Sequence, residues 1–241
     1  MKILTKTTLL VSLLAIGLGT AFASTTDELM LTVGGLTATI TDNGGCAGTG
    51  CTGLVGDVQP SAGATEVLGT IGGWTIVAVV GTTFSPIDVP EGLGLVALTA
   101  TCAALSPCTA DPLDVLYSDI GFSPANPAFE SGFSATIGGT GSASQSAYYS
   151  NSNTLFAETN QIGTTLGPIT STSLGLTTSG GVGSVAPYSL TLEETFADTS
   201  AGAVSFQTGG NVSSVPEPGA VILFGTVLAL CSSKLRRRRA S

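Results

Sequence analysis

The stretch GGWTIVAVV, residues 72–80, has the pattern that decides the fold of this chain. Two glycines are followed by a tryptophan and six small or β-branched residues, none of them charged. Aromatic and β-branched residues favour strands, and a Gly-Gly pair in front of such a run marks a turn. The stretch therefore predicts a β-strand at residues 74–80 that begins directly after a turn.

Similar short runs recur on both sides of this stretch, and glycine-rich turn signals separate them. The turn signals are Asn43-Gly44-Gly45, Gly138-Gly139, Gly180-Gly181 and Gly209-Gly210. The runs predict further strands at residues 29–33, 36–41, 95–101, 115–120, 133–137, 190–195 and 203–208. Many short strands with few charges are typical of an antiparallel β-sandwich, which we expect from about Asp27 to Thr208, followed by an extended linker. Residues 142–183 have the weakest pattern, and we expect long loops or a weakly ordered segment there.

Positive charge is confined to the two ends of the chain, and there is no histidine. The seven basic residues are Lys2, Lys6, Lys234, Arg236, Arg237, Arg238 and Arg239. Residues 24–215 hold all of the 16 carboxylates except Glu217 and have no basic side chain, so their formal charge is near −15. Repulsion from phosphate groups therefore excludes nucleic acid as a partner of this body.

The N-terminal end has the three parts of a signal peptide. MKILTK supplies a basic region, LLVSLLAIGLG an apolar core, and Ala21-Phe22-Ala23 a cleavage site of small residues. We expect signal peptidase to remove residues 1–23, so that the exported protein begins at Ser24. An uncleaved anchor is the alternative, although the apolar run is short for a membrane span.

The C-terminal end combines an extended segment, an apolar run and the basic cluster. Its first residues are Val215-Pro216-Glu217-Pro218-Gly219, and the two prolines keep this segment out of helix and sheet. Residues 219–233 are uncharged and mostly apolar, and as a helix they would span about 22 Å at ~1.5 Å per residue. We expect a short transmembrane helix here, with Lys234 and the four arginines on the cytoplasmic side and the acidic body outside.

In this order, the Pro-Glu-Pro segment, the apolar run and the Arg-rich end resemble the PEP-CTERM sorting signal of Gram-negative bacteria. The resemblance covers only residues 215–241. It implies secretion through the signal peptide, a transient hold in the membrane, and processing by an exosortase, a membrane-embedded enzyme similar to a cysteine transpeptidase. It also implies an association with exopolysaccharide and the biofilm matrix. A permanent single-span anchor without processing is the alternative for the same residues.

Four of the five cysteines form two closely spaced pairs in the exported body. The pairs Cys46/Cys51 and Cys102/Cys108 predict two short-loop disulfides, because disulfides form in oxidising compartments. Cross-pairing stays open, since four cysteines allow three connectivities. A zinc site is disfavoured because the chain has neither C-x-x-C spacing nor histidine, so we expect no metal ligands. Cys231 lies in the apolar tail.

The missing residue types exclude most catalytic arrangements. Without His, Lys or Arg, the body has no Ser-His-Asp triad, no Ser-Lys dyad and no basic phosphate clamp. A glycosidase needs only two carboxyl groups, for which the sequence neighbours Asp111, Asp114 and Asp119, or Glu193 and Glu194, are candidates. Fifteen like charges bring some acids close together in any case, so we interpret these groups as solvated acidic surface and expect no enzyme.

Calcium is the one cofactor that the composition suggests, since carboxylates without basic partners attract divalent cations. The segments to consider are Asp42-Asn43-Gly44-Gly45 and residues 111–119. Neither matches a known calcium loop, so the expectation remains no cofactor. A calcium- or carbohydrate-binding adhesion module, permanently anchored, is the alternative function, and an exposed aromatic pair such as Tyr148-Tyr149 would favour it.

The sequence as a whole predicts three parts: a signal peptide at 1–23, a β-sandwich ectodomain at 24–214 and a sorting signal at 215–241. The expected function is an exported surface or extracellular-matrix protein, structural or associated with exopolysaccharide. Its expected partners are signal peptidase, an exosortase and the matrix, with the membrane contacted through the C-terminal helix. The expected location is the cell surface or the extracellular space after a transient membrane-anchored stage.

Overall fold

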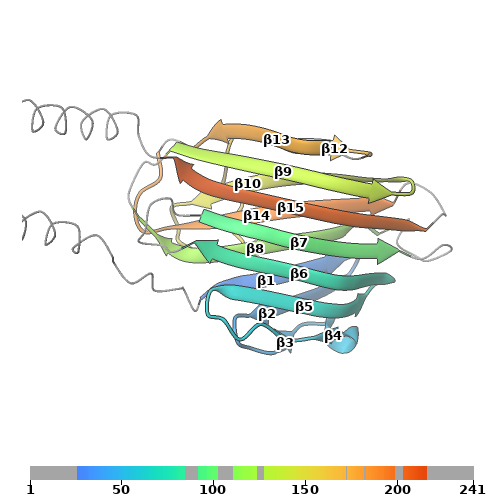
Figure 1. Ribbon diagram of the computed structural model, residues 1–241. Helices are drawn as coiled ribbons and strands as arrows, with labels where there is room; N and C mark the ends of the chain where they lie inside the picture. Colours follow the sequence, from blue (N-terminus) through green and yellow to red (C-terminus); the bar gives the residue numbers. More distant parts are fainter. Residues whose placement is uncertain are drawn as a thin grey trace, which may run out of the picture.

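The computed structural model describes residues 26–84, 92–102, 111–123, 128–171, 173–181, 183–198 and 203–215. These residues form two β-sheets that face each other, and the strands of each sheet pair antiparallel (Figure 1). The predicted mostly β, antiparallel sandwich is therefore confirmed.

The first sheet, named sheet A, has the strand order β11-β10-β14-β8-β1-β2-β3, and β12 pairs with β10. Its strands are β1 (Glu28–Val33), β2 (Leu36–Thr41), β3 (Cys46–Ala47), β8 (Leu113–Phe122), β10 (Gly141–Ser150), β11 (Asn160–Gln161), β12 (Leu166–Ile169) and β14 (Tyr188–Asp198).

The second sheet, named sheet B, has the order β13-β9-β15-β7-β6-β5-β4. Its strands are β4 (Leu54–Val55), β5 (Ala64–Ile71), β6 (Trp74–Phe84), β7 (Gly92–Cys102), β9 (Ala128–Gly138), β13 (Ser173–Gly180) and β15 (Val204–Val215). A short 3-10 helix, η2 (Cys51–Gly53), lies directly before β4. The strand predicted from the GGWTIVAVV stretch is the first part of β6.

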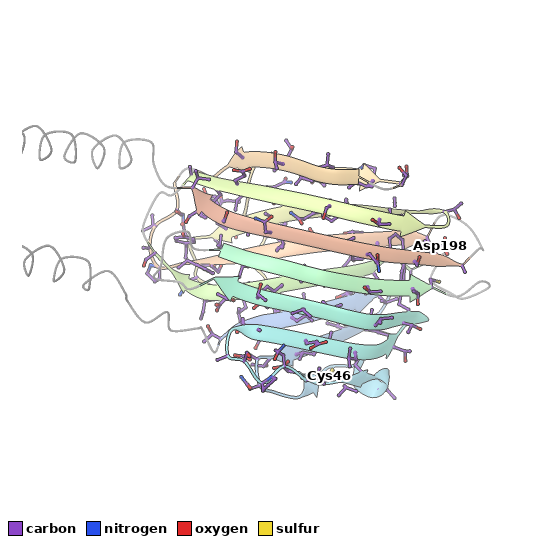
Figure 2. The ribbon with its side chains drawn as sticks, viewed as in Figure 1. Cys46 and Asp198 are labelled. Carbon is purple, nitrogen blue, oxygen red and sulfur yellow. A yellow bond between two sulfur atoms is a disulfide. The ribbon has the colours of Figure 1, made fainter. Side chains whose placement is uncertain are left out.

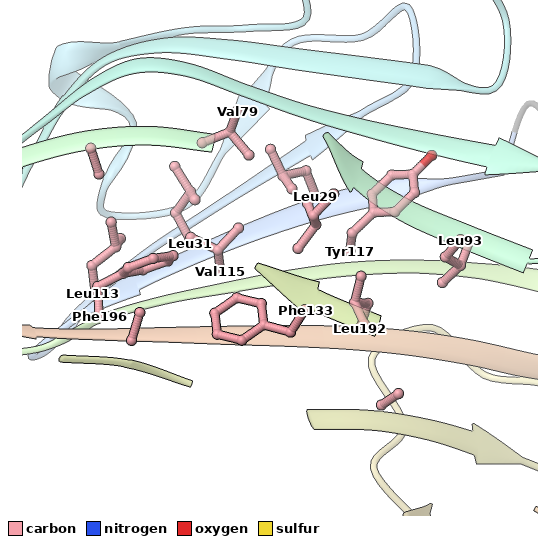
Figure 3. Packing of buried hydrophobic residues seen from close by; sticks show 14 of the residues in the cluster. Leu29, Leu31, Val79, Leu93, Leu113, Val115, Tyr117, Phe133, Leu192 and Phe196 are labelled. Carbon is pink, nitrogen blue, oxygen red and sulfur yellow. The ribbon is translucent and has the colours of Figure 1, made fainter. Parts of the chain in front are cut away.

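The core lies between the sheets because successive side chains of a strand point to opposite faces. In β15, buried and more exposed residues alternate over its whole length, and β1 alternates in the same way. One aromatic group in the core joins Trp74, Phe196 and Phe206, with ring centroids 5.2–5.7 Å apart. Figure 3 shows Phe196 and Tyr117 among the aliphatic side chains of this core.

A second aromatic group lies between β8, β9, β10 and β14. Phe129 packs edge-on against Tyr188 and is stacked on Tyr149, and Phe122 is stacked on Tyr188. All four rings are buried. Burial of rings of this size contributes strongly to the hydrophobic stabilisation of both sheets.

Two expectations about the arrangement of strands are wrong. Residues 142–183 contain β10, β11, β12 and β13, and β10 pairs with both β11 and β14. Three successive inward positions of β10, namely Ala143, Gln145 and Ala147, give little hydrophobic signal although all three are buried. Burial here is imposed by the neighbouring strands and not by side-chain apolarity.

The expected extended linker after Thr208 is also wrong, because the chain continues as a strand to Val215. β15 lies in the interior of sheet B and pairs with β7 and β9 on its two sides. The predicted turn at Gly209-Gly210 is a shift of register within β15. Figure 1 shows β15 between these two neighbours.

The first and last described residues lie at the same end of the sandwich. Ser213 of β15 and Phe84 of β6 both pair with Gly92, which places the end of β15 near the end of β6. Thr83 lies 3.0 Å from the Tyr117 hydroxyl, which in turn donates to Asp27, the residue before β1. Both chain ends therefore leave the described fold from this end.

Within the part of the chain that the structure describes, none of the helices has the length and apolarity to cross a bilayer. The predicted helix at residues 219–233 lies outside the described residues.

Candidate functional site

A group of carboxyl side chains, named the junction cluster, lies where the chain enters β1. It consists of Asp27, Asp42 and Asp119, with Thr65 and Tyr117 as hydroxyl donors. The Asp27 carboxyl has no exposed surface, and its Oδ2 accepts hydrogen bonds from the Tyr117 hydroxyl at 2.7 Å and the Thr65 hydroxyl at 2.8 Å. Its Oδ1 is buried and has no hydrogen-bond partner among the described residues.

Burial raises the pKa of Asp27 to about 6, because the charged carboxylate loses its hydration. The Tyr117 and Thr65 hydroxyls act in the opposite direction, since they stabilise the charged form. The nearby carboxylates of Asp42 and Asp119 raise the pKa further through repulsion. Asp27 is therefore mostly ionised at pH 7 and becomes neutral in mildly acidic solution.

The other two acids of the junction cluster bind the chain entry to the rest of the fold. Asp119 accepts a hydrogen bond from the Thr26 hydroxyl at 2.7 Å. Asp42 accepts one from the Gly63 amide at 2.9 Å, and its own amide donates to the Asp27 carbonyl at 3.2 Å. The cluster thus joins residues that are up to 93 positions apart in the sequence.

The calcium candidates are divided between different places. Asp42 and Asp119 belong to the junction cluster, and the Asn43 side chain donates to Asp42 Oδ1. Asp111 lies elsewhere, beside Gly34, which is a residue of the turn between β1 and β2. Asp114 points away from the core, on the outer face of sheet A. Among the described residues there is no group of three or more acidic or cysteine side chains arranged to hold a metal ion.

A second buried polar group, named the core bridge, crosses the space between the sheets. It consists of Glu194 on β14, Gln145 on β10, Thr208 on β15 and Ser131 on β9. The Thr208 hydroxyl donates to Glu194 Oε2 at 2.5 Å, and Gln145 Nε2 donates to Ser131 Oγ at 2.8 Å. Glu194 and Gln145 also pair directly across the two strands of sheet A.

Burial raises the pKa of Glu194 to about 8, and the hydrogen bond from Thr208 offsets only part of this effect. The side chain has no exposed surface. Glu194 is therefore predominantly a neutral carboxylic acid at pH 7. The expectation that the candidate acids form solvated surface is wrong for Asp119 and Glu194, which are fully buried, as Asp27 is too.

Glu193 and Glu194 do not converge, because adjacent residues of a strand point to opposite faces. Glu193 lies on the outer face of sheet A and accepts a hydrogen bond from the Tyr148 hydroxyl at 3.1 Å. Partial burial and the neighbouring Glu158 raise the pKa of Glu193. The same alternation separates Tyr148 from Tyr149, whose ring is buried in the core, so the exposed aromatic pair considered above does not form.

The disulfide between Cys46 and Cys51 is present, which confirms the first predicted pair. It lies at the edge of the sandwich where β3, η2 and β4 meet, and Figure 2 labels Cys46 there. Cys102 is also disulfide-bonded. Its expected partner Cys108 lies outside the described residues, so this pairing stays a prediction.

Most residues of the two predicted processing signals lie outside the described part of the chain. These are Ala21, Ala23 and Ser24 of the signal cleavage site, Pro216, Glu217, Pro218 and Gly219 of the sorting motif, and the basic residues Lys234 and Arg236 to Arg239. Val215 is described, and it is the last residue of β15.

Two shallow surface hollows lie near the end of the sandwich that carries the β5–β6 turn. One is lined by hydroxyl side chains that include Thr49, Thr52 and Thr70, and the other includes Thr75 and Ser205. Neither hollow is lined by a carboxyl group. The buried acids therefore do not open into either of them.

The sequence pointed to Asp42, Asp119 and Glu194 as candidate acids, but not to Asp27 or Gln145. Asp27 was only the approximate start of the sandwich, and Gln145 lay in the segment with the weakest pattern. A polar residue at an inward position, as in Ala143-Ser144-Gln145-Ser146-Ala147, is the one signal that could have identified Gln145.

No protein-family model matches the chain, and no curated protein matches it. Weak structural likenesses include TmCBM61 in complex with beta-1,4-galactotriose, at 9% identity and a TM-score of 0.32, over 59% of this chain and 88% of that chain. The infectious bursal disease virus Gx strain structure has 8% identity and a TM-score of 0.35, over 82% and 69%.

A third likeness is to the CBM22-1–GH10 modules of Clostridium thermocellum xylanase 10B, complexed with xylohexaose. It has 13% identity and a TM-score of 0.29, over 61% of this chain and 27% of that chain. The chain thus spans about a quarter of the length of these modules. Similarities at this level assign neither a family nor a ligand to this chain.

Proposed function

We propose that this chain is an exported, non-catalytic ectodomain that is delivered by its C-terminal sorting signal and released into, or attached to, the extracellular matrix. The observation that supports this proposal most directly is that the described sandwich fills the interval between the two predicted processing signals. β1 begins at Glu28, shortly after the expected cleavage at Ala23, and β15 ends at Val215, directly before Pro216.

This coincidence has a physical consequence for processing. An exosortase that acts at Pro216-Glu217-Pro218 would cut outside the last strand, so that every hydrogen bond of β15 with β7 and β9 remains in the released product. Both ends leave the fold on the same side, so a chain held by either signal would present the same end of the sandwich to the membrane.

The chemistry of the body supports a structural role in the matrix. The Cys46–Cys51 disulfide fits an oxidising compartment outside the cytoplasm. The exported segment has no basic side chain at all, and three of the acids that the structure describes have no exposed surface. Release of the tail would leave an anionic product rich in Ser and Thr, which is suited to a hydrated exopolysaccharide matrix.

The test uses the native host and a variant with both Pro216→Ala and Pro218→Ala. We expect the wild-type protein to appear outside the cell with a C-terminus shortened within the sorting signal, as measured by mass spectrometry. The variant should remain in the membrane fraction at higher mass. Pro60→Ala, a change at an exposed proline in a loop of the ectodomain, is the matched control and should be processed like the wild type.

If wild type and variant both stay full-length in the membrane, the tail is a permanent anchor and the proposal is wrong. A purified protein that hydrolysed polysaccharide, and lost this activity on a single Asp→Asn or Glu→Gln change, would contradict the non-catalytic part.

A further inference from the structure

Two buried oxygen atoms of the core bridge converge on one point beside β15. Glu194 Oε1 and Gln145 Oε1 both lack a hydrogen-bond partner among the described residues. A Cβ atom placed on Gly210 would lie 1.7 Å from Gln145 Oε1 and 2.6 Å from Glu194 Oε1. Because both distances start from the same point, the two oxygens are at most about 4.3 Å apart, a limit that includes the separation of an O–H···O hydrogen bond.

Two acceptor oxygens at this separation repel each other unless one of them carries a proton. The orientation of the Gln145 amide follows from its other contacts, since Nε2 donates to the Gly132 carbonyl at 3.0 Å as well as to Ser131 Oγ. A carbonyl only accepts, so a rotated amide would place two carbonyl oxygens against each other. Gln145 Oε1 must therefore face Glu194 as an acceptor.

We propose that Glu194 is held as the neutral acid and donates its Oε1 hydrogen to Gln145 Oε1, which closes a proton-dependent clasp between the two sheets. The hydrogen bonds then run from Thr208 to Glu194, from Glu194 to Gln145, from Gln145 to Ser131, and from Ser131 Oγ to the Asn211 carbonyl at 3.1 Å. The path starts and ends on β15 and includes β14, β10 and β9. This inference goes beyond the proposed function and does not depend on it.

Among the described residues around Glu194, no other group could compensate a negative charge. The facing positions are Val115 on β8, Gln145 on β10, Ser131 and Gly132 on β9, and Thr208 and Gly210 on β15, none of which is titratable. On β14 itself, Asp198 lies four positions away on the same face, beyond Phe196, and Glu193 faces outward. The described residues include no Lys, Arg or His. The pKa of about 8 for Glu194, raised by burial, agrees with this geometry.

The clasp makes the stability of the fold depend on pH. The pKa of Glu194 is higher in the folded state than its ordinary value of 4.5 in the unfolded chain. The protonated side chain therefore stabilises the fold fully below about pH 4.5, and this stabilisation is lost as the pH rises to about 8. Since one proton is involved, the equilibrium constant for unfolding should rise about tenfold per pH unit in this window. Above the window, the ionised Glu194 faces a carbonyl oxygen with no proton between them.

The test is a chemical-denaturation series between pH 5 and 9 on the exported protein with its disulfides intact. Glu194→Gln keeps the shape of the side chain, and its amide donates to Gln145 and accepts from Thr208 without titrating. We expect this variant to fold and to lose the tenfold-per-unit dependence between pH 6 and 8. Glu130→Gln, which removes an exposed carboxyl beside Ser131, is the control and should keep that dependence.

A direct measurement on the wild-type protein covers the case in which the variant does not fold. The carboxyl carbon of Glu194, followed by NMR, should report the neutral acid at pH 7 and titrate near pH 8 without loss of the fold. Titration of Glu194 near its ordinary value, or an unchanged dependence between pH 6 and 8 in Glu194→Gln, would overturn the proposal.

Discussion

Asp27 and Glu194 are both carboxyl side chains without exposed surface, yet the fold treats them differently. At the junction cluster, two hydroxyl donors converge on Asp27 Oδ2 and keep it largely ionised at neutral pH, with a pKa of about 6. In the core bridge, Glu194 accepts from the Thr208 hydroxyl alone, and its pKa rises to about 8. The difference has two sources: the surrounding atoms enclose Glu194 more completely than Asp27, so its desolvation is larger, and Asp27 has one more hydroxyl donor.

The two acids also differ in their charged neighbours. Asp42 and Asp119 repel the charge of Asp27, whereas no charged neighbour contributes to the shift at Glu194. Asp27 stays ionised in spite of that repulsion, so two well-placed hydroxyl groups outweigh two nearby carboxylates. Residues 24–215 have no basic side chain, so hydroxyl donors perform there the role that Lys and Arg have in most proteins.

Both polar groups also depend on a glycine in the opposite sheet. A Cβ at Gly81 of β6 would lie 2.4 Å from ring atoms of Tyr117, and Gly210 of β15 leaves the space that Gln145 and Glu194 occupy. Each glycine lies inside a strand, where a missing side chain allows one from the facing sheet to cross. The two positions have no positive φ, so their importance is one of space alone.

The largest effect is expected from Gly210→Ala, which breaks the core bridge. The added Cβ overlaps Gln145 Oε1 and displaces Glu194, so buried hydrogen bonds are lost in addition to the overpacking. We expect a loss of about 3–5 kcal/mol in the free energy of unfolding, measured by chemical denaturation. Gly209→Ala is the matched control, since its Cβ would meet no atom closer than 3.8 Å and should cost less than about 1 kcal/mol. Equal losses in the two variants would refute the spatial role of Gly210.

The next effect separates the pH windows of the two acids. The pKa of Asp27 is raised from 3.8 to about 6. The contribution of protonated Asp27 to the free energy of unfolding is therefore complete below about pH 4 and is lost as the pH rises to 6. Asp27→Asn should remove about 2 kcal/mol of pH dependence between pH 4 and 6 and leave the dependence between pH 6 and 8 unchanged. Denaturation curves across this range measure both windows. Glu28→Gln, the adjacent substitution on the outer side of β1, serves as the control, and a change above pH 6 in Asp27→Asn would contradict the assignment.

The smallest effect is expected from Tyr117→Phe, which removes one donor from the junction cluster. Loss of the hydroxyl should destabilise the protein by about 1.5 kcal/mol at pH 7 and raise the pKa of Asp27, because the charged form loses a hydrogen bond. NMR titration of the Asp27 carboxyl carbon measures this shift. Tyr148→Phe removes a hydroxyl that donates to the half-buried Glu193 and should leave Asp27 unchanged. An unshifted Asp27 in Tyr117→Phe would show that Thr65 alone sets its charge state.

Much of the architecture followed from local patterns. The predicted strand at 36–41 agrees with β2 at both ends, and the strand predicted at 74–80 begins, like β6, at Trp74. The turn signal at Asn43-Gly44 lies between β2 and β3, and the pair Gly138-Gly139 marks the end of β9, whose last residue is Gly138. These features are local, since alternation and turn chemistry act within a few residues.

The wrong predictions for β10 and for Gly209-Gly210 have a common cause. β10 has small and polar residues where a core strand normally has large apolar ones, so its sequence gives little sign of burial. At Gly209-Gly210, a pair of glycines that normally marks a turn lies within a strand, because the facing sheet needs the space. Neither feature is visible without the partner strands.

The sequence by itself determined that this chain forms short antiparallel strands and that the acids of residues 24–215 have no basic partners within that segment, and it favoured the pairing of Cys46 with Cys51. Only the tertiary structure decided which acids are buried and which of these keep their charge. Alternation assigns each side chain to one face of its own sheet. The groups that surround it on that face come from residues distant in sequence, as when Thr26 donates to Asp119, 93 positions away. The charge state of a carboxyl depends on how completely it is buried and on the donors within hydrogen-bond distance, and long-range strand pairing decides both.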